Sequence, residues 1–287
     1  MDIKIRRKPS NSANTSTSLL KAVRVLQCFS FNEPELGIAD ILRKVDMPRT
    51  TVHRILSSLL NTNLLERDNK SGRYRIGPAL YMMGSLYLGT TDIITAAEPV
   101  TRLINELTGE YVKLSVFDRG NIVVIKKEES RNGFRYYHNI GTILPAYASA
   151  MGKAFLSELT ETQLDNLYPQ EYLIPLTNKT ITSRTQLKKE LEQIKKTGVS
   201  YDFEGNTEGL IGIASVIKSA GGKVVSAICT GTSTHGIEEK RLQRLSEMVI
   251  LGARVISYRL GYQDSQSIDL DVEQIRVWWE RNNNISS

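Results

Sequence analysis

Guanidinium, hydroxyl and imidazole side chains recur along residues 49–61, where the apolar residues have helical spacing. Val52, Ile55 and Leu56 begin an apolar stripe that Leu59 and Leu60 continue, so a helix here would bury one face. The opposite face is polar, and side chains of these types donate hydrogen bonds to phosphates and base edges. The candidate DNA-contacting residues of this segment are Pro48, Arg49, Thr50, Thr51, His53, Arg54 and Ser57.

A second group of cations follows in a segment that predicts a short β-hairpin. Residues 64–67 and 73–76 flank a turn at 68–72, in which Gly72 can adopt a positive φ. Lys70, Arg73 and Arg75 would lie on or near the tip of this hairpin. They are therefore candidate contacts to the DNA backbone.

These segments occur in the order that a winged helix-turn-helix domain requires. Ile38, Ile41, Leu42 and Val45 predict a first helix, which Pro48 ends because proline disfavours helical geometry in the preceding residue. We therefore predict a winged helix-turn-helix over 17–77. An opening helix would pack beneath it through the stripe Leu19, Leu20, Val23, Leu26 and Phe29. The alternative, a solvated helical hairpin with ordinary surface cations, does not account for this order and compact spacing.

The distribution of charge points to the same partner. Residues 1–80 hold 14 Lys and Arg against 7 Asp and Glu, whereas the remaining residues hold 23 against 24. A cationic module beside a near-neutral one predicts a polyanion partner, double-stranded DNA, for the first module alone. Residues 1–16 combine the basic run 4–8 with Ser, Asn and Thr, which predicts a flexible basic arm making sequence-independent phosphate contacts.

Catalysis would require acids, bases or nucleophiles at a defined spacing. Asp202, Glu204 and Glu208 could supply a carboxylate pair, but nothing in the sequence sets their geometry. No nucleophile elbow or zinc-protease motif is present. None of the three histidines has a Cys or a second His at metal-ligand spacing: His53, His138 and His235. We therefore expect a protein that is not an enzyme, with no catalytic residues, no metal and no cofactor.

The rest of the chain predicts a linker helix and a second domain of class α+β. Residues 78–92 carry more apolar surface than one small domain needs, so this helix could pack against a second chain. Over 93–262, hairpin signals at 118–121 and 219–222 alternate with capping signals at Thr160 and Ser183. A long amphipathic helix follows at about 238–260. Strand pairs interspersed with helices predict a mostly antiparallel sheet.

Residues 263–287 form a C-terminal extension whose structure the sequence leaves open. With Trp278 and Trp279, it could be an amphipathic helix packed on the body or on a partner, or a loose extension. No run approaches ~18 uninterrupted apolar residues, and the N-terminus lacks an apolar signal core, so we expect no membrane span and a cytoplasmic location. Cys28 and Cys229 have no partner at useful spacing, and we expect reduced, buried thiols.

Two segments of the second domain, together with the winged domain, resemble the IclR family of bacterial transcriptional regulators over roughly 17–262. Residues 141–154, GTILPAYASAMGKA, are similar to the family's G-x-x-x-P…S/T-A-x-G-K-A signature. Residues 201–214, YDFEGNTEGLIGIA, are similar to its D-x-E…G-x-x-C-I-A segment. The resemblance implies a GAF-like effector-binding and oligomerisation domain at 93–262, dimers or tetramers, and transcription controlled by a small metabolite.

Residues 147–154 are poorly suited to a phosphate-binding P-loop, because Tyr147 replaces the leading glycine and Ala154 replaces Ser or Thr. Ser149 could instead cap a helix whose small first residues leave backbone N–H groups open to an anion. A tightly packed strand-to-helix turn is the alternative. The resemblance favours an effector site, and the residues expected there are Leu144, Ala150, Met151, Gly152, Asp202, Gly212, Cys229 and Gly231.

Asp202 matches the family's acidic pocket residue, which could accept a ligand hydroxyl. Three other positions depart from the family. Gly212 stands where the family usually has Cys, and Cys229 and Gly231 stand where it has serines. These changes predict a roomier and less polar pocket. We expect an organic or sugar-derived acid larger than pyruvate as the effector.

The resemblance and the residues together predict a regulator of metabolic genes that binds a pseudo-palindromic operator as a homodimer or homotetramer. Effector binding would change the placement of the winged domains and so the affinity for DNA. Repression is the expected sign, with activation by the same architecture as the alternative. An enzyme with an appended DNA-binding domain is less favoured. So is an effector-independent DNA-binding protein, because the second domain is larger than a dimerisation element needs to be.

Overall fold

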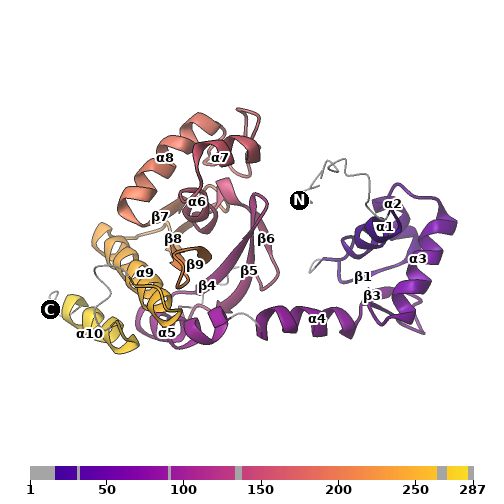
Figure 1. The fold of residues 1–287 in the computed structure, drawn as a ribbon, viewed down its shortest axis with the longest axis horizontal. Coiled ribbons are helices and arrows are strands. Elements are labelled where there is room, and N and C mark those ends of the chain that lie inside the picture. The colour runs from indigo at the N-terminus through magenta and orange to yellow at the C-terminus, as the bar shows by residue number, and fades with distance from the viewer. Residues whose placement is uncertain (1–16, 31–32, 90–91, 133–137, 264–269, 284–287) are drawn as a thin grey trace. The chain divides into compact units, whose positions relative to one another are not determined.

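A computed structural model of the chain describes residues 17–30, 33–89, 92–132, 138–263 and 270–283 (Figure 1). The expected arm at 1–16 lies outside the described residues. The chain divides into two compact units, Met1–Thr91 and Asp92–Ser287. Each unit has its own buried core.

The first unit combines a helix-turn-helix with a three-stranded antiparallel sheet. Its elements are α1 (Thr17–Leu26), β1 (Glu35–Leu36), α2 (Ile38–Lys44), α3 (Arg49–Asn61), β2 (Leu65–Arg67), β3 (Tyr74–Ile76) and α4 (Pro78–Gly89). The strands lie in the order β1-β3-β2, so β3 is central. Val52, Ile55 and Leu56 of α3 are buried as the apolar stripe predicts. Pro48 lies at the N-cap of α3, where a missing N–H costs nothing.

Helix α1 buries a different face from the one expected. It packs on α3 through Ala22, Val25 and Leu26, whereas Leu19, Leu20 and Val23 are exposed. The expected packing of the whole stripe beneath the helix pair is therefore wrong. The stripe is apolar at helical spacing, but the small domain covers only one edge of it.

The second unit is built on a six-stranded antiparallel sheet with the order β6-β5-β4-β9-β8-β7. The strands are β4 (Val112–Asp118), β5 (Asn121–Glu128), β6 (Ile143–Pro145), β7 (Ser200–Phe203), β8 (Leu210–Lys218) and β9 (Val224–Ser233). Both expected hairpins are present, and Gly120 and Gly222 adopt positive φ in their turns. Strand β7 forms one edge of this sheet.

Helices cover both faces of the sheet (Figure 1). On one face lie α5 (Asp92–Thr108), α9 (Glu239–Arg259) and α10 (Val272–Asn283), over a core that includes Leu114, Ile213 and Ile228. On the other lie α6 (Ala150–Leu156), α7 (Glu161–Leu167) and α8 (Arg184–Thr197), with a short 3-10 turn, η1 (Ala146–Ala148), before α6. An antiparallel sheet with interspersed helices confirms the α+β class.

The C-terminal extension contains a packed helix. In α10, Ile275 and Trp279 are buried against α5 and α9. Among the residues that the structure describes, no helix combines the length and apolar character needed to cross a membrane.

Candidate DNA interface and effector site

Helix α3 presents the residues expected to contact DNA on its outer face. Its buried stripe faces the core of the first unit, so the opposite side chains face solvent. Thr51 is half-buried, and the others are exposed: Pro48, Arg49, Thr50, His53, Arg54 and Ser57. Within the described residues, no ion pair involves Arg49 or Arg54. Two guanidinium groups are thus available at one helix surface.

The hairpin between β2 and β3 places Lys70 at its tip. The carboxylate of Asp68 closes the turn, since its Oδ1 accepts the backbone N–H of Lys70 at 3.1 Å and of Ser71 at 2.6 Å. Arg67 stacks on Tyr74 with its Cζ 5.5 Å from the ring centroid and donates to the Gly72 carbonyl. The tip is therefore held by its own side chains while Lys70 remains exposed.

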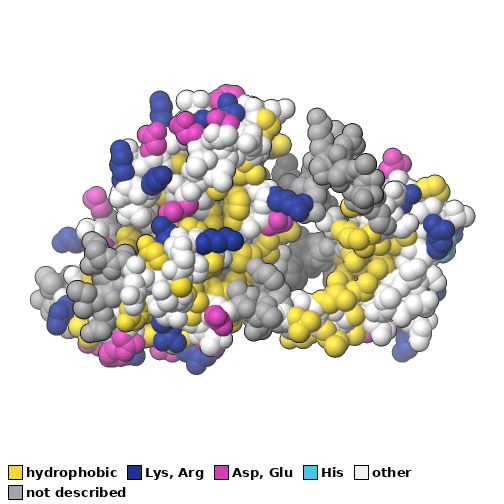
Figure 2. Space-filling view, viewed as in Figure 1, with side chains coloured by type: hydrophobic (Ala, Val, Ile, Leu, Met, Phe, Trp, Pro, Cys, Tyr) yellow, Lys and Arg dark blue, Asp and Glu magenta, His cyan; other side chains and the backbone are white. Residues whose placement is uncertain are grey.

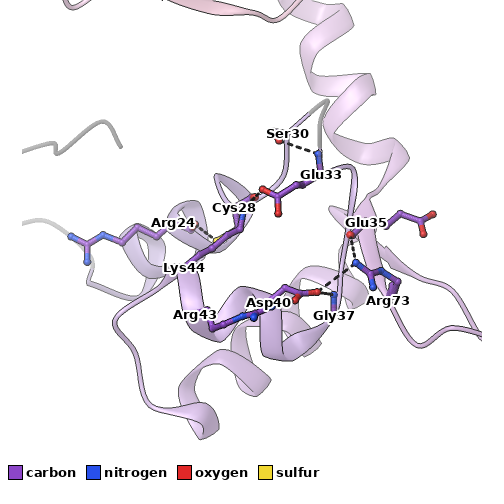
Figure 3. A network of polar contacts seen from close by, with 10 residues as sticks. All are labelled: Arg24, Cys28, Ser30, Glu33, Glu35, Gly37, Asp40, Arg43, Lys44 and Arg73. Atoms are coloured by element: carbon purple, nitrogen blue, oxygen red, sulfur yellow. Dashed lines mark hydrogen bonds and ion pairs between the residues drawn. The ribbon is translucent and has the colours of Figure 1, made fainter. Parts of the chain in front are cut away.

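Arg73 and Arg75, expected at the DNA backbone, already have partners in the protein. The guanidinium of Arg73 donates to the Glu35 carbonyl at 2.8 Å and lies 3.5 Å from the Asp40 carboxylate (Figure 3). Arg75 pairs with Glu66 at 2.8 Å across β2 and β3. Both of these cations are therefore paired with carboxylates, whereas Lys70 has no ion pair among the residues that the structure describes.

Asp40 is the centre of this polar network and was not among the expected functional residues (Figure 3). It caps α2 by accepting the Gly37 N–H at 2.9 Å, and it also pairs with Arg43 and Arg73. The hydrogen bonds from Gly37 and then Arg43 lower the pKa of Asp40. Asp40 stands three positions after the N-cap of α2, so the sequence could have predicted the cap. Nothing local could have predicted the contact between Asp40 and Arg73.

In the second unit, η1 and α6 form the predicted turn into a helix. Ser149 is the N-cap of α6, and its Oγ accepts the Gly152 N–H at 3.1 Å. A Cβ on Gly152 would lie 2.2 Å from the Ala146 backbone, so this turn is closely packed. Four of the expected effector residues share one apolar cluster here: Leu144, Ala150, Met151 and Cys229. The structure thus brings them together where α6 meets the sheet.

The expectation of a roomier pocket is wrong, because neighbouring groups fill the space that the glycines leave. The hydroxyl of Tyr111 lies 2.4 Å from where a Cβ of Gly231 would be. Residue Gly212 faces α6, and its Cβ would lie 3.3 Å from that of Ala150. These glycines allow close packing of a tyrosine and a helix on the sheet.

Asp202 and Glu204 close the loop that follows β7. The two oxygens of Asp202 accept the N–H groups of Gly205 at 2.8 Å and Asn206 at 3.2 Å. Glu204, which has a positive φ, accepts the Gly209 N–H at 2.8 Å. Burial raises the pKa of Asp202 to about 6, opposed by the charge of Lys153 and by the loop N–H groups. Asp202 is therefore a buried carboxylate held in place by the loop backbone.

A cavity of about 450 Å³ lies beside Asp202, between α8 and the edge strand β7; we call it the edge cavity. Of the eight expected effector residues, Asp202 is the one that lines it. Its other lining residues with a charged or amide side chain are Lys153, Lys179, Gln186, Glu190 and Gln193. Sequence reasoning placed none of these five at a ligand.

The sheet face beneath α6 also carries a buried cation. Lys113 is 3% exposed, and its ammonium lies 4.3 Å from the centroid of the Tyr111 ring. Burial lowers the pKa of Lys113 to about 8 and that of His138 to about 4, and it raises the pKa of Cys229 to about 11. Both cysteines are free and buried, and the Cys229 thiol stays protonated at neutral pH.

A winged helix-turn-helix and a separate α+β unit containing a cavity define the class of two-domain DNA-binding regulators. Comparison with known proteins places the chain within that class. Residues 18–69 match the IclR helix-turn-helix domain, and residues 85–258 match the bacterial transcriptional regulator IclR C-terminal domain. The chain belongs to the IclR family of transcriptional regulators.

Individual relatives align over most of their length. The chain is 30% identical to the HTH-type transcriptional regulator KdgR of Escherichia coli, over 86% of this chain and 94% of the relative. It is 27% identical to the transcriptional repressor IclR of the same organism, over 89% and 95%. An IclR homolog from Microbacterium hydrocarbonoxydans, solved in complex with 4-hydroxybenzoate, has the same fold, with a TM-score of 0.74, 21% identity and coverage of 85% and 99%.

Proposed function

We propose that this protein is a repressor that binds a pseudo-palindromic operator as a dimer or a pair of dimers and is released by a small acid. The observation that carries the DNA-binding part is the outer face of α3, where Arg49 and Arg54 are exposed beside short hydroxyl side chains. A helix of this kind fits the major groove, whose base edges accept hydrogen bonds from arginine.

The wing contacts the phosphate backbone through Lys70, and Arg73 and Arg75 position it. This division is supported by the ion pairs of the two arginines with Asp40 and Glu66. A cation already paired with a carboxylate releases fewer counterions when it meets a phosphate, so it contributes less to salt-dependent binding.

Dimerisation through α1 and α4 is supported by apolar side chains that the first unit leaves uncovered (Figure 2). Leu19 is 65% exposed, Tyr81 79% and Met83 58%. Soluble monomers rarely expose a contiguous apolar surface of this kind, and a second copy of the same helices would cover it. Two winged units would then face two half-sites of an operator.

Control by a metabolite rests on the second unit, which contains a cavity and is larger than dimerisation needs. The Microbacterium relative that shares this fold was solved with an aromatic hydroxy acid bound. Effector binding changes the placement of the two winged units and thereby the affinity for DNA. Genes for metabolism of the same acid are the expected targets.

The test uses a duplex that the full chain selects from random sequence, with binding followed by fluorescence anisotropy at several salt concentrations. Arg54→Ala should lose about 1–3 kcal/mol of binding free energy for the selected duplex, and it should tolerate more base changes at one position of each half-site. Lys70→Ala should weaken binding to all duplexes and reduce the salt slope by about one. Lys223→Ala, an exposed lysine of the second unit, is the control. Unchanged affinity in both test variants would rule out this docking.

A further inference from the structure

The edge cavity has the chemistry of a site for a hydroxylated acid. Its volume of about 450 Å³ lies within the usual range for small-molecule sites, roughly 300–1,000 Å³. It is bounded by α8, by β7 and by the loop around Lys179. This inference rests on the proposed function, since it identifies the ligand class and the residues through which the second unit would sense it.

The floor of the cavity is charged and buried. Lys153 is 6% exposed and forms an ion pair with Glu190 of α8, and Asp202 is 9% exposed. Burying charged groups costs free energy unless hydrogen bonds and opposite charges compensate. Loop N–H groups provide two such bonds to Asp202, and its remaining lone pairs can accept from a ligand.

The rim is held in a defined position. Thr180 donates from its Oγ1 to the Gly205 carbonyl at 2.5 Å, and Thr177 donates to the Glu204 carbonyl at 2.7 Å. These bonds join the loop that carries Lys179 to the loop that Asp202 closes. The Lys179 side chain is exposed, and no ion pair with it is present in the described part of the chain. The cavity therefore has a positioned backbone and an available cation at its mouth.

Helix α8 lines the cavity with amides along its length. Gln186, Glu190 and Gln193 lie on one face, since they are four and then three residues apart. At 1.5 Å per residue, Gln186 and Gln193 are about 10 Å apart along the helix axis. Amide groups both donate and accept, so a ligand matching this wall needs several hydroxyls.

We propose that the edge cavity binds a small polyhydroxylated carboxylate, with the carboxylate on Lys179 and the hydroxyls on Asp202, Gln186 and Gln193. A purely apolar ligand would leave these polar groups without hydrogen-bond partners, which would lower its affinity strongly. An amino acid such as glutamate has no hydroxyls, so it would leave the amides of Gln186 and Gln193 with fewer partners.

The experiment is isothermal titration calorimetry on the full chain with gluconate, galactonate and glucuronate. Glucitol, which lacks the carboxylate, and hexanoate, which lacks the hydroxyls, are the matched probes. At least one sugar acid should bind, and the two probes should bind at least about tenfold more weakly, because each lacks one set of charged or polar contacts. Lys179→Met should weaken sugar-acid binding by a similar factor, and Lys223→Met should leave it unchanged.

Hydrogen–deuterium exchange locates the ligand, with protection expected in 186–197 and 200–205. Equal binding of a sugar acid to Lys179→Met, or protection confined to 144–152, would overturn the assignment. So would failure of all three sugar acids to bind, or tighter binding of glutamate than of any of them. None of these results affects operator binding by the chain, whereas the absence of any selected duplex would contradict the regulator function itself.

Discussion

At the scale of single residues, the partner of a charged group decides its role more than its type does. Lys70, Arg73 and Arg75 are equivalent as cations in the sequence, yet two of them are paired with carboxylates of the protein. Asp202 was expected to contact a ligand, but its oxygens also accept hydrogen bonds from loop N–H groups, and its side chain lines the edge cavity. Both cases lead to measurable consequences.

Arg73→Met distinguishes positioning from phosphate contact. If Arg73 positions the wing through Asp40, the variant should bind the selected duplex more weakly but keep the salt slope of the wild type. Asp40→Asn should also bind more weakly. Removing a negative charge near DNA would by itself strengthen binding, so the sign of this change is informative. A salt slope reduced by about one in Arg73→Met would instead assign it to a phosphate.

Asp202 should make the stability of the second unit depend on pH. Its pKa of about 6 in the folded state exceeds the ordinary 3.8, so its ionisation opposes folding. That cost is fully present above pH 6 and is relieved as the pH falls toward 3.8. When the pH falls from 7.5 to 5, the free energy of unfolding of the wild type should therefore rise by about 1–1.5 kcal/mol relative to that of Asp202→Asn. Both tryptophans lie in α10, so their fluorescence during denaturation reports the second unit, and a constant difference would contradict the assignment.

At the scale of elements, glycines let helix α6 and the sheet approach closely. Gly152 faces the backbone of η1, and Gly231 lies beneath Tyr111. Each lacks space for one added carbon. The segment that starts α6 is therefore closely packed against η1, and the same segment is predicted to line an effector site.

Gly152→Ala should destabilise the second unit by about 1–3 kcal/mol or more, since its Cβ would lie 2.2 Å from the Ala146 backbone. Gly221→Ala, where no atom lies within 4 Å of the added carbon, is the control in the same unit and should change stability little. Urea denaturation followed by tryptophan fluorescence measures both. Equal stability of the two variants would show that η1 can move aside.

At the scale of the whole molecule, the exposed apolar residues of α1 and α4 connect the fold to assembly. The first unit buries one edge of α1 and leaves Leu19, Leu20 and Val23 at the surface. A monomer would expose these side chains to water, whereas a symmetric pair could bury them against their own copies. DNA recognition at two half-sites then depends on the same contact.

Combining Leu20→Glu with Met83→Glu should raise the dimer dissociation constant at least about tenfold, because burying two added charges is costly. Analytical ultracentrifugation of the full chain measures this, with Ile174→Glu, an exposed apolar position of the second unit, as the control. If the double variant sediments as wild type does, the dimer interface lies elsewhere.

The sequence alone determined the elements whose causes are local. The stripe of Val52, Ile55 and Leu56 with Pro48 before it predicted α3, and turn residues predicted both hairpins of the second unit. Capping by Ser149 was likewise readable. Helical period, proline geometry and caps depend on neighbours within a few residues, so one sequence is sufficient to predict them.

Only the tertiary structure decided which distant groups meet. Arg73 reaches Asp40 from 33 residues away, and Tyr111, the residue before β4, fills the space above Gly231 of β9. The edge cavity exists because the strand order places β7 at the border of the sheet, beside α8. Such contacts depend on how the sheet and its covering helices close, and that closure is a property of the whole unit rather than of any segment.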